Sequence, residues 1–186
     1  MTPLRQVPVD EAIDGFLRDP REDSFVSVFR KLYDPLCRYF IARGLDSSTA
    51  EELVQDVLLT VYRRAGELRS QVCFTGWLFR VARNCLLQHV RKRRVAAESL
   101  TEDLDEGALR YSSTFRIPEE SELFEWMQVL EDDEREICLM RYLDGLDYQS
   151  IGEALQIPLG TVKWKLHRVK KKIAARLAVS TRGRKP

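Results

Sequence analysis

The stretch Leu146–Ile173, LDYQSIGEALQIPLGTVKWKLHRVKKKI, has the pattern of two helices separated by a short turn. Ile151 and Leu155 lie four residues apart, so they share one face of the first helix. A break follows at Gln156-Ile157-Pro158, and the second helix is predicted to begin near Pro158, because proline is well tolerated in a first helical turn. The apolar residues of this helix recur every three or four positions: Val162, Leu166, Val169 and Ile173.

The remaining positions of the second helix are basic. No acid occurs between Pro158 and Arg176, and seven positions carry basic side chains: Lys163, Lys165, His167, Arg168, Lys170, Lys171 and Lys172. A solvated helix usually mixes Lys with Glu, since opposite charges four residues apart stabilise it. A basic face without acids therefore indicates a helix that binds a polyanion such as DNA, rather than one that is only solvated. A short helix, a tight turn and a basic helix are typical of a helix-turn-helix that enters the DNA major groove.

Composition sets the outer limits of the interpretation. The chain has 186 residues, of which 44% are hydrophobic and 32% charged, so it can form one domain or two small ones. Its net charge is only +1, but the positive charge is concentrated in particular segments. The sequence has no apolar run long enough to cross a bilayer and no signal peptide, so we expect a cytoplasmic protein without membrane insertion.

Motifs for catalysis or metal binding are absent from the sequence. The four cysteines lie far apart, the only histidines are His89 and His167, and no CxxC pair occurs, so a zinc site is not expected. The sequence contains neither a glycine-rich phosphate loop nor a nucleophile–base pair at a recognisable spacing. We therefore expect a protein that is not an enzyme and has no cofactor.

Helical periodicity divides the chain into two all-α domains. We expect an extension (1–23), a first bundle of three to four helices (24–94), a flexible acidic linker (95–118), a four-helix domain with the helix-turn-helix (119–178) and a basic tail (179–186). Pro35 is expected to kink or break the first long helix, and Ser48–Glu51 matches a capping box that starts the next one. Trp77 is expected in the core, and a new helix is expected to begin at Pro118.

Three motifs resemble those of bacterial sigma factors. Ala50–Val57, AEELVQDV, is similar to their AEDLVQ-type motif, and Phe74–Asn84, FTGWLFRVARN, resembles F-x-x-WL-x-x-IARN. Asp147–Lys163 resembles the Y-x-EIA-x-x-LGIP-x-GTVK of their C-terminal domain. The motifs occur in the family's order over roughly Ser24–Leu177, and the linker is too short for a middle domain. The chain is therefore identified as a member of the minimal two-domain subgroup, the extracytoplasmic-function (ECF) sigma factors.

The resemblance implies roles for the first domain. In the family this domain docks on the clamp helices of RNA polymerase, which makes Glu52, Gln55, Asp56 and Leu59 the candidate contact face; the alternative is that these acids only solvate the helix. The loop Glu67–Phe74 would capture an unstacked base of the −10 promoter element. Candidate −10 contacts are Ser70, Phe74, Arg80, Arg83, Asn84 and Arg91, with His89 and Arg93 also near the phosphates.

The second domain would read the −35 element as a duplex. Its candidate contacts are Leu159, Gly160, Thr161, Lys163, Trp164, Lys165 and Arg168. The sequence departs from the family's GTVKSRL here, because Trp164 replaces a small residue and Lys165 replaces an arginine. Lysine cannot form the bidentate contact that arginine makes to guanine, so the promoter preference of relatives is not expected to carry over.

The expected function is that of a sigma factor. The expected partners are core RNA polymerase, through its clamp and flap elements, and promoter DNA. ECF relatives are commonly held inactive by an anti-sigma factor, which makes such a factor a further candidate partner. Two alternatives are a helix-turn-helix regulator that acts without polymerase and an interaction scaffold that binds no nucleic acid. Only the scaffold predicts no salt-dependent affinity for DNA.

Overall fold

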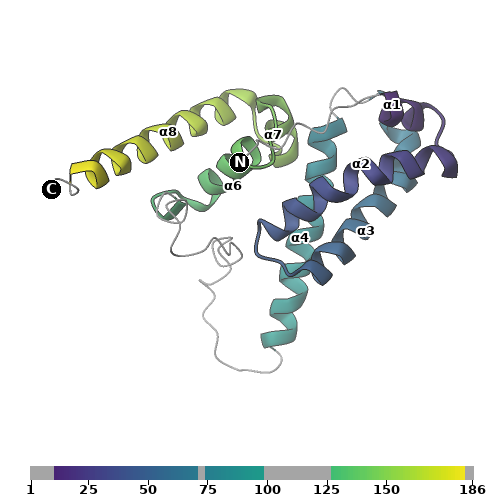
Figure 1. The fold of residues 1–186 in the computed structure, drawn as a ribbon, viewed down its shortest axis with the longest axis horizontal. Helices are drawn as coiled ribbons and strands as arrows, with labels where there is room; N and C mark the ends of the chain where they lie inside the picture. Colours follow the sequence, from purple (N-terminus) through teal and green to yellow (C-terminus); the bar gives the residue numbers. More distant parts are fainter. Residues whose placement is uncertain (1–10, 71–73, 99–126, 183–186) are drawn as a thin grey trace.

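The computed structural model of the chain describes residues 11–70, 74–98 and 127–182, and every regular element in these ranges is a helix (Figure 1). The first part contains α1 (Glu11–Arg18), α2 (Glu22–Ile41), α3 (Ser47–Arg64), the 3-10 helix η1 (Ala65–Ser70) and α4 (Phe74–Glu98). The second part contains α6 (Asp132–Tyr142), α7 (Tyr148–Leu155) and α8 (Leu159–Arg182). The all-α prediction is confirmed. None of the described helices is long and apolar enough to cross a bilayer.

The first bundle packs α2, α3 and α4 around a shared apolar core. Each helix contributes residues at three- and four-residue spacings, among them Leu32 and Leu36 of α2 and Val54 and Val57 of α3, all fully buried. Trp77 is only 2% exposed, so its expected place in the core is confirmed. Helix α1 buries Ile13, Phe16 and Leu17 and packs against α2, so it belongs to this bundle rather than to an extension outside it.

Two expectations about the helices of the first bundle can be compared with the structure. Helix α2 continues through Pro35, so the expected break does not occur, while the expected kink stays a prediction. Helix α3 begins at Ser47 rather than inside Ser48–Glu51, because Asp46 provides the cap. The Asp46 carboxylate accepts hydrogen bonds from the backbone N–H and the hydroxyl of Thr49, each at 2.9 Å. The hydrogen bonds from Thr49 hold the pKa of Asp46 below its usual value.

Helix α4 extends beyond the end expected for the first bundle. Helix α4 runs to Glu98, which takes it into the first positions of the expected linker. The first half of the expected loop before α4, Glu67–Ser70, belongs to η1. The rest of the expected linker and the helix predicted from Pro118 lie outside the described residues.

The helix-turn-helix has the expected form. Asp147 caps α7 by accepting a hydrogen bond from the backbone N–H of Ser150 at 2.7 Å. Gln156 ends this helix in the left-handed conformation, with φ of 57°. Gly152 lets the turn close tightly, since a Cβ there would lie 3.0 Å from the backbone oxygen of Ile157. The predicted break and the buried positions Val162, Leu166 and Val169 of α8 are confirmed.

One hydrophobic cluster connects the two parts of the chain. It joins the core of the first bundle to Ile137 and Met140 of α6, Ile151 of α7 and Val162 of α8. Within the described residues, the most extensive helix–helix contact joins α4 to α7. A smaller cluster lies between α6 and the middle of α8, and Figure 1 shows the rest of α8 running away from the first bundle.

Candidate functional site

The outer surface of α8 is only partly available for binding. Lys163 and Trp164 are exposed, and Leu159 and Gly160 are exposed at the start of the helix, where its first backbone N–H groups have no intrahelical partner. Thr161 is half-buried. The first turns of α8 therefore present an uncrowded surface with one lysine and one aromatic ring.

Three cations of α8 have acidic partners at the beginning of α6. Lys165 pairs with Asp133. Arg168 lies 3.0 Å from Glu131 and 3.2 Å from Glu134. The ammonium group of Lys172 forms ion pairs with the same two glutamates, Glu131 at 3.2 Å and Glu134 at 2.5 Å. These acids come from another helix, so the expectation that the basic face lacks compensating acids is wrong for these positions.

The ion pairs change the ionisation of the groups involved. The hydrogen bond from Lys172, together with the charges of Lys172 and Arg168, lowers the pKa of Glu131 below its usual value. The hydrogen bond to Glu134 raises the pKa of Lys172. Both shifts favour the charged forms, so the α6–α8 contact is an ion-pair network at neutral pH. The network joins the beginning of α6 to α8.

Trp164 is held by a neighbouring cation. The guanidinium of Arg168 lies 4.8 Å from the centroid of the Trp164 ring, within the range of a cation–π contact. The ring is 53% exposed, so only part of it is covered. Arg168 thus contacts both Glu134 and Trp164, and it serves to orient the aromatic ring as well as to carry charge.

The candidate −10 residues occupy different environments along α4. Asn84 and Arg91 are exposed, while Arg80 and Arg83 are half-buried. Phe74 is only 3% exposed and packs with its ring centroid 6.1 Å from that of Trp77, so in this structure it is part of the core. The side chain of Ser70 lies outside the described residues. The exposed members of this set, among the described side chains, are therefore Asn84 and Arg91.

The two further −10 candidates on this part of α4, His89 and Arg93, differ in charge. Arg93 is exposed. Burial and the charge of Arg93 lower the pKa of His89, which favours the neutral imidazole. His89 therefore adds no positive charge to the surface at neutral pH.

Arg80 lies close to the start of α8. It lines a recess together with Gly152, Glu153 and Gln156 of the helix-turn-helix and with Leu159 of α8. Residues predicted for two separate promoter elements are thus brought together at one place. This arrangement follows from the packing of α7 on α4.

The candidate polymerase-binding residues form a single stripe on α3. Glu52, Gln55, Asp56 and Leu59 are all exposed, and their spacing places them on one side of the helix, opposite the buried Val54, Val57 and Leu58. Leu59 is 45% exposed, so an apolar side chain lies at one end of an acidic and polar surface. Such a mixed stripe suits a protein partner, because the apolar group gains from burial and the acids supply specificity.

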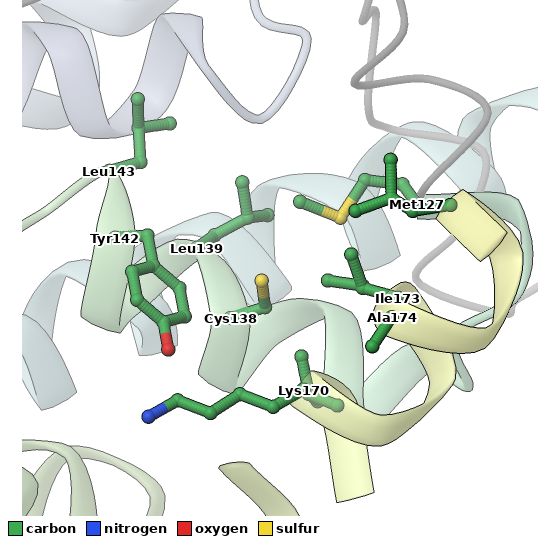
Figure 2. Close-up of a pocket in the computed structure, with 10 residues that line it drawn as sticks. Met127, Cys138, Leu139, Tyr142, Leu143, Lys170, Ile173 and Ala174 are labelled. Atoms are coloured by element: carbon green, nitrogen blue, oxygen red, sulfur yellow. The ribbon is translucent and has the colours of Figure 1, made fainter. Parts of the chain in front are cut away.

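An apolar groove of about 460 Å³ lies between α6 and α8 (Figure 2). Figure 2 shows Cys138, Leu139 and Tyr142 of α6 facing Ile173 and Ala174 of α8 across it. The remaining lining residues are Met127, Leu143, Val169, Lys170 and Leu177. Sequence reasoning did not predict this groove. The signal was present, because the apolar residues of α6 occupy both the side that carries Ile137 and Met140 and the side that carries Cys138 and Leu139.

Comparison with known proteins identifies the family. A model described as Sigma-70 region 2 matches residues 28–95, and one described as Sigma-70, region 4 matches residues 122–173. The RNA polymerase sigma-H factor of Pseudomonas aeruginosa is 30% identical over 140 residues, which cover 69% of this chain and 72% of that protein. The chain belongs to the ECF family of RNA polymerase sigma factors.

The match to another relative covers only part of that protein. The ECF RNA polymerase sigma factor SigE of Mycolicibacterium smegmatis is 31% identical over 134 residues. The match covers 69% of this chain and 52% of SigE, so the match spans about half the length of that protein.

Solved structures share the fold of this sigma factor. CnrH, in complex with the cytosolic domain of CnrY, has a TM-score of 0.63 at 17% identity, over 92% of this chain and 99% of that one. The sigma factor RpoE of Bartonella quintana, in complex with the anti-sigma factor NepR, has a TM-score of 0.56 at 20% identity, over 85% and 96% of the two chains. The region 2 match includes α3 and α4, and the region 4 match includes the helix-turn-helix.

Proposed function

We propose that this sigma factor, which directs promoter-specific transcription initiation, binds core RNA polymerase through the α3 stripe of Glu52, Gln55, Asp56 and Leu59. The exposure of all these side chains on one side of α3 is the observation that carries the proposal. The stripe lies within the residues that match Sigma-70 region 2. Glu52, Gln55 and Asp56 belong to the motif Ala50–Val57, and the resemblance of this motif to that of sigma factors implies docking on the polymerase clamp. Polymerase supplies the chemistry, and the sigma factor supplies the choice of promoter.

The −35 element is proposed to contact the first turns of α8. The exposed start of the helix offers backbone N–H groups to a phosphate, and Lys163 adds a positive charge beside them. Trp164, which Arg168 contacts, is also exposed and is suited to an apolar contact in the major groove. Lys165 and Arg168 act through their ion pairs to position this surface.

The −10 element is proposed to contact the exposed part of α4. Asn84 can donate and accept hydrogen bonds to an extruded base, and Arg91 can bind a phosphate. This surface is assigned to the melted strand because the family places its −10 reading in region 2, and the match with region 2 includes α4.

The α6–α8 groove is proposed to receive an apolar helix face of the polymerase flap. Its lining is almost entirely apolar, and a groove between two helices matches the way an amphipathic helix binds. Tyr142 and Leu177 at the groove are 51% and 40% exposed, so a docked helix would remove apolar surface from water.

An anti-sigma factor is proposed as a further partner. A sigma factor with the same fold has been solved with an anti-sigma factor bound, and another with the cytosolic domain of CnrY. We place the action of this chain in the cytoplasm, where transcription takes place in bacteria.

The decisive experiment is co-elution with purified bacterial core RNA polymerase on a sizing column, without DNA. A one-to-one complex is expected for the native chain. The Gln55→Ala and Asp56→Ala variants should weaken it, because both side chains lie on the proposed contact face. Asp34→Ala is the matched control, since Asp34 is an exposed acid of the neighbouring helix α2 and lies off the stripe.

The DNA-binding part of the proposal is tested with the same complex. Lys163→Glu should abolish transcription from a −35-dependent promoter while co-elution is retained. Lys31→Glu makes the same charge change at an exposed site of α2 and should leave transcription intact. If folded native chain forms no complex at micromolar concentration, the polymerase-binding role is wrong, and a regulator that binds duplex DNA alone becomes the leading account.

A further inference from the structure

Arg43 lies just beyond the end of α2 and is fully buried. Its guanidinium lies 3.5 Å from the centroid of the Tyr39 ring, and Nη1 donates a hydrogen bond to the backbone oxygen of Tyr39 at 3.0 Å. The Tyr39 ring packs against Phe79 of α4 with centroids 5.3 Å apart. One side of the guanidinium is thus held by Tyr39, which packs in the core of the first bundle.

The outer side of the same guanidinium reaches the second part of the chain. Nη2 donates to Oδ2 of Asp144 at 2.8 Å and to Oε1 of Glu136 at 3.2 Å. These partners lie 101 and 93 residues further along the sequence, and both carboxylates are buried. We call Arg43, Glu136 and Asp144 the interdomain lock.

The lock holds one positive and two negative charges away from water. Burial alone would lower the pKa of Arg43, but the charges of Glu136, Tyr39 and Asp144 outweigh it and raise the pKa, so the cation persists. Burial raises the pKa of Asp144 although Arg43 opposes this shift. Without Arg43, two carboxylates would be left buried without a cation. Separation of the two parts would then return both carboxylates to water.

The contact that the lock secures brings two DNA-reading surfaces together. Helix α7 packs on α4, and Arg80 of α4 shares a recess with Leu159 at the start of α8. The names of the −10 and −35 elements place them about 25 base pairs apart, which is about 85 Å along a duplex at about 3.4 Å per base pair. Asn84 and Arg91 follow Arg80 along α4 by about 6 Å and about 17 Å, at about 1.5 Å per residue. The proposed −10 and −35 surfaces of this structure therefore cannot reach both elements on one duplex.

We propose that the interdomain lock holds the free sigma factor in a closed state, which must open before the two promoter elements can be engaged together. The proposal rests on the proposed function and adds regulation to it. Polymerase binds the open state only. The apparent affinity for polymerase is therefore the affinity of the open state multiplied by the fraction of molecules that are open. Loss of Arg43 removes this penalty.

The lock is tested first without polymerase, by small-angle X-ray scattering of the full chain. Arg43→Met is expected to raise the radius of gyration by several ångströms while the helical circular dichroism is unchanged. Arg38→Met is the matched control, because Arg38 is an exposed arginine in the last turn of the same helix. An unchanged radius of gyration in folded Arg43→Met overturns the proposal, whatever polymerase does.

A triple variant distinguishes the lost cation from a general loss of packing. Replacement of all the charged groups of the lock, as Arg43→Met, Glu136→Met and Asp144→Leu, leaves no buried charge, and such replacements often retain a packed structure. The triple variant should return to the native radius of gyration. If it is as expanded as Arg43→Met alone, the charges are not what closes the chain.

The native chain gives an independent readout if Arg43→Met does not fold. Hydrogen exchange is measured on the free chain and on its complex with core polymerase, without DNA. Amides of α7 should exchange faster in the complex, because α7 leaves α4, while amides of α3 should exchange more slowly. Unchanged or slower exchange in α7 overturns the lock. Absence of any complex counts against the proposed function instead, and the scattering test of the lock stands by itself.

Folded Arg43→Met links the lock to polymerase binding. It should bind core polymerase several-fold more tightly than the native chain, whereas Arg38→Met should bind as the native chain does. Equal affinity of Arg43→Met and native chain, in a variant whose radius of gyration has risen, would show that opening does not limit binding, and would overturn the regulatory role.

Discussion

Arg168 of α8 and Glu134 of α6 form an ion pair, with 3.2 Å between Nε and Oε1, and the Glu134 side chain is fully buried. Glu134 also accepts a hydrogen bond from the backbone N–H of Glu131 at 3.0 Å, which caps α6. One carboxylate therefore starts one helix and fixes the position of another. The positions of Arg168 and Lys172 on the basic face of α8 therefore depend on Glu134 of α6.

Glu134→Gln should destabilise the chain and strengthen its nonspecific binding to DNA. The amide oxygen can keep the capping hydrogen bond, but the charge that holds Arg168 and Lys172 is lost. Breaking a buried ion pair costs about 3–5 kcal/mol, and the partners here are 35% and 29% exposed, so we expect a loss of about 1–2 kcal/mol in the free energy of unfolding. Urea denaturation measures the stability, and fluorescence anisotropy with labelled duplex measures DNA affinity.

Glu22→Gln is the control for this substitution. Glu22 is exposed in the first turn of α2 and belongs to the other part of the chain. The Glu22→Gln substitution removes the same charge as Glu134→Gln, so any general effect of net charge on DNA affinity appears in both variants. Equal stability and equal DNA affinity of the two variants would mean that Glu134 does not restrain α8.

The local features of the fold could be predicted because they depend on neighbouring residues. The spacing of Val162, Leu166 and Val169 was sufficient to place α8 and its buried side, and the break at Pro158 located the turn. Caps were less certain, since Asp46 and Ser48 are both good N-cap residues and only the structure shows which one accepts the hydrogen bonds. The break expected at Pro35 does not occur, because the helix propensity of one residue is weaker than packing along a long helix.

The long-range contacts could not be predicted from spacing. Glu131 pairs with Lys172 across 41 residues, and Arg43 pairs with Asp144 across 101. Nothing in a single sequence specifies which acid meets which base, because that depends on how the helices pack. The residues proposed for the promoter and for polymerase remain predictions, although the structure places Glu52 and Lys163 on exposed surfaces and Phe74 in the core.

Two glycines of the helix-turn-helix should respond oppositely to alanine. At Gly152 a Cβ would lie 3.0 Å from the backbone oxygen of Ile157, so Gly152→Ala forces the turn to shift and should cost about 1–2 kcal/mol. At Gly160 nothing lies within 4 Å of the added atom, and alanine is the better helix former by up to about 1 kcal/mol, so Gly160→Ala should raise the melting temperature. Calorimetry of both variants checks the signs. A stabilised Gly152→Ala would show that the turn has room the structure does not reveal.

The apolar groove should matter for polymerase binding more than for folding. Tyr142→Ser and Leu177→Ser remove exposed apolar groups that line it, so the free energy of unfolding should change by no more than about 0.5 kcal/mol. The affinity for core polymerase should fall several-fold without being abolished, because α3 still binds. Val26→Ser, at a 47% exposed site of α2, is the control and should leave the affinity unchanged. Native affinity in both groove variants would exclude the groove as a polymerase contact.

Cys138 provides a chemical probe of the same groove. Burial raises the pKa of its thiol to about 11, and the side chain is 4% exposed. The thiolate is the reactive form, so at pH 8 only about one thiol in a thousand is reactive, compared with about one in four for an ordinary cysteine of pKa about 8.5. Alkylation by iodoacetamide, followed at the Cys138 peptide by mass spectrometry, should be slow at pH 8 and rise about tenfold per pH unit toward pH 11.

The alkylation rate also reports on what occupies the groove. A docked polymerase helix would cover Cys138 further, so its rate should fall in the complex, while the urea-unfolded chain should react at the rate of a free thiol. Rapid alkylation of the native chain at pH 8 would mean that α6 and α8 separate often enough to expose the thiol. In that case the groove would be a transient opening between two helices rather than a preformed surface for a partner.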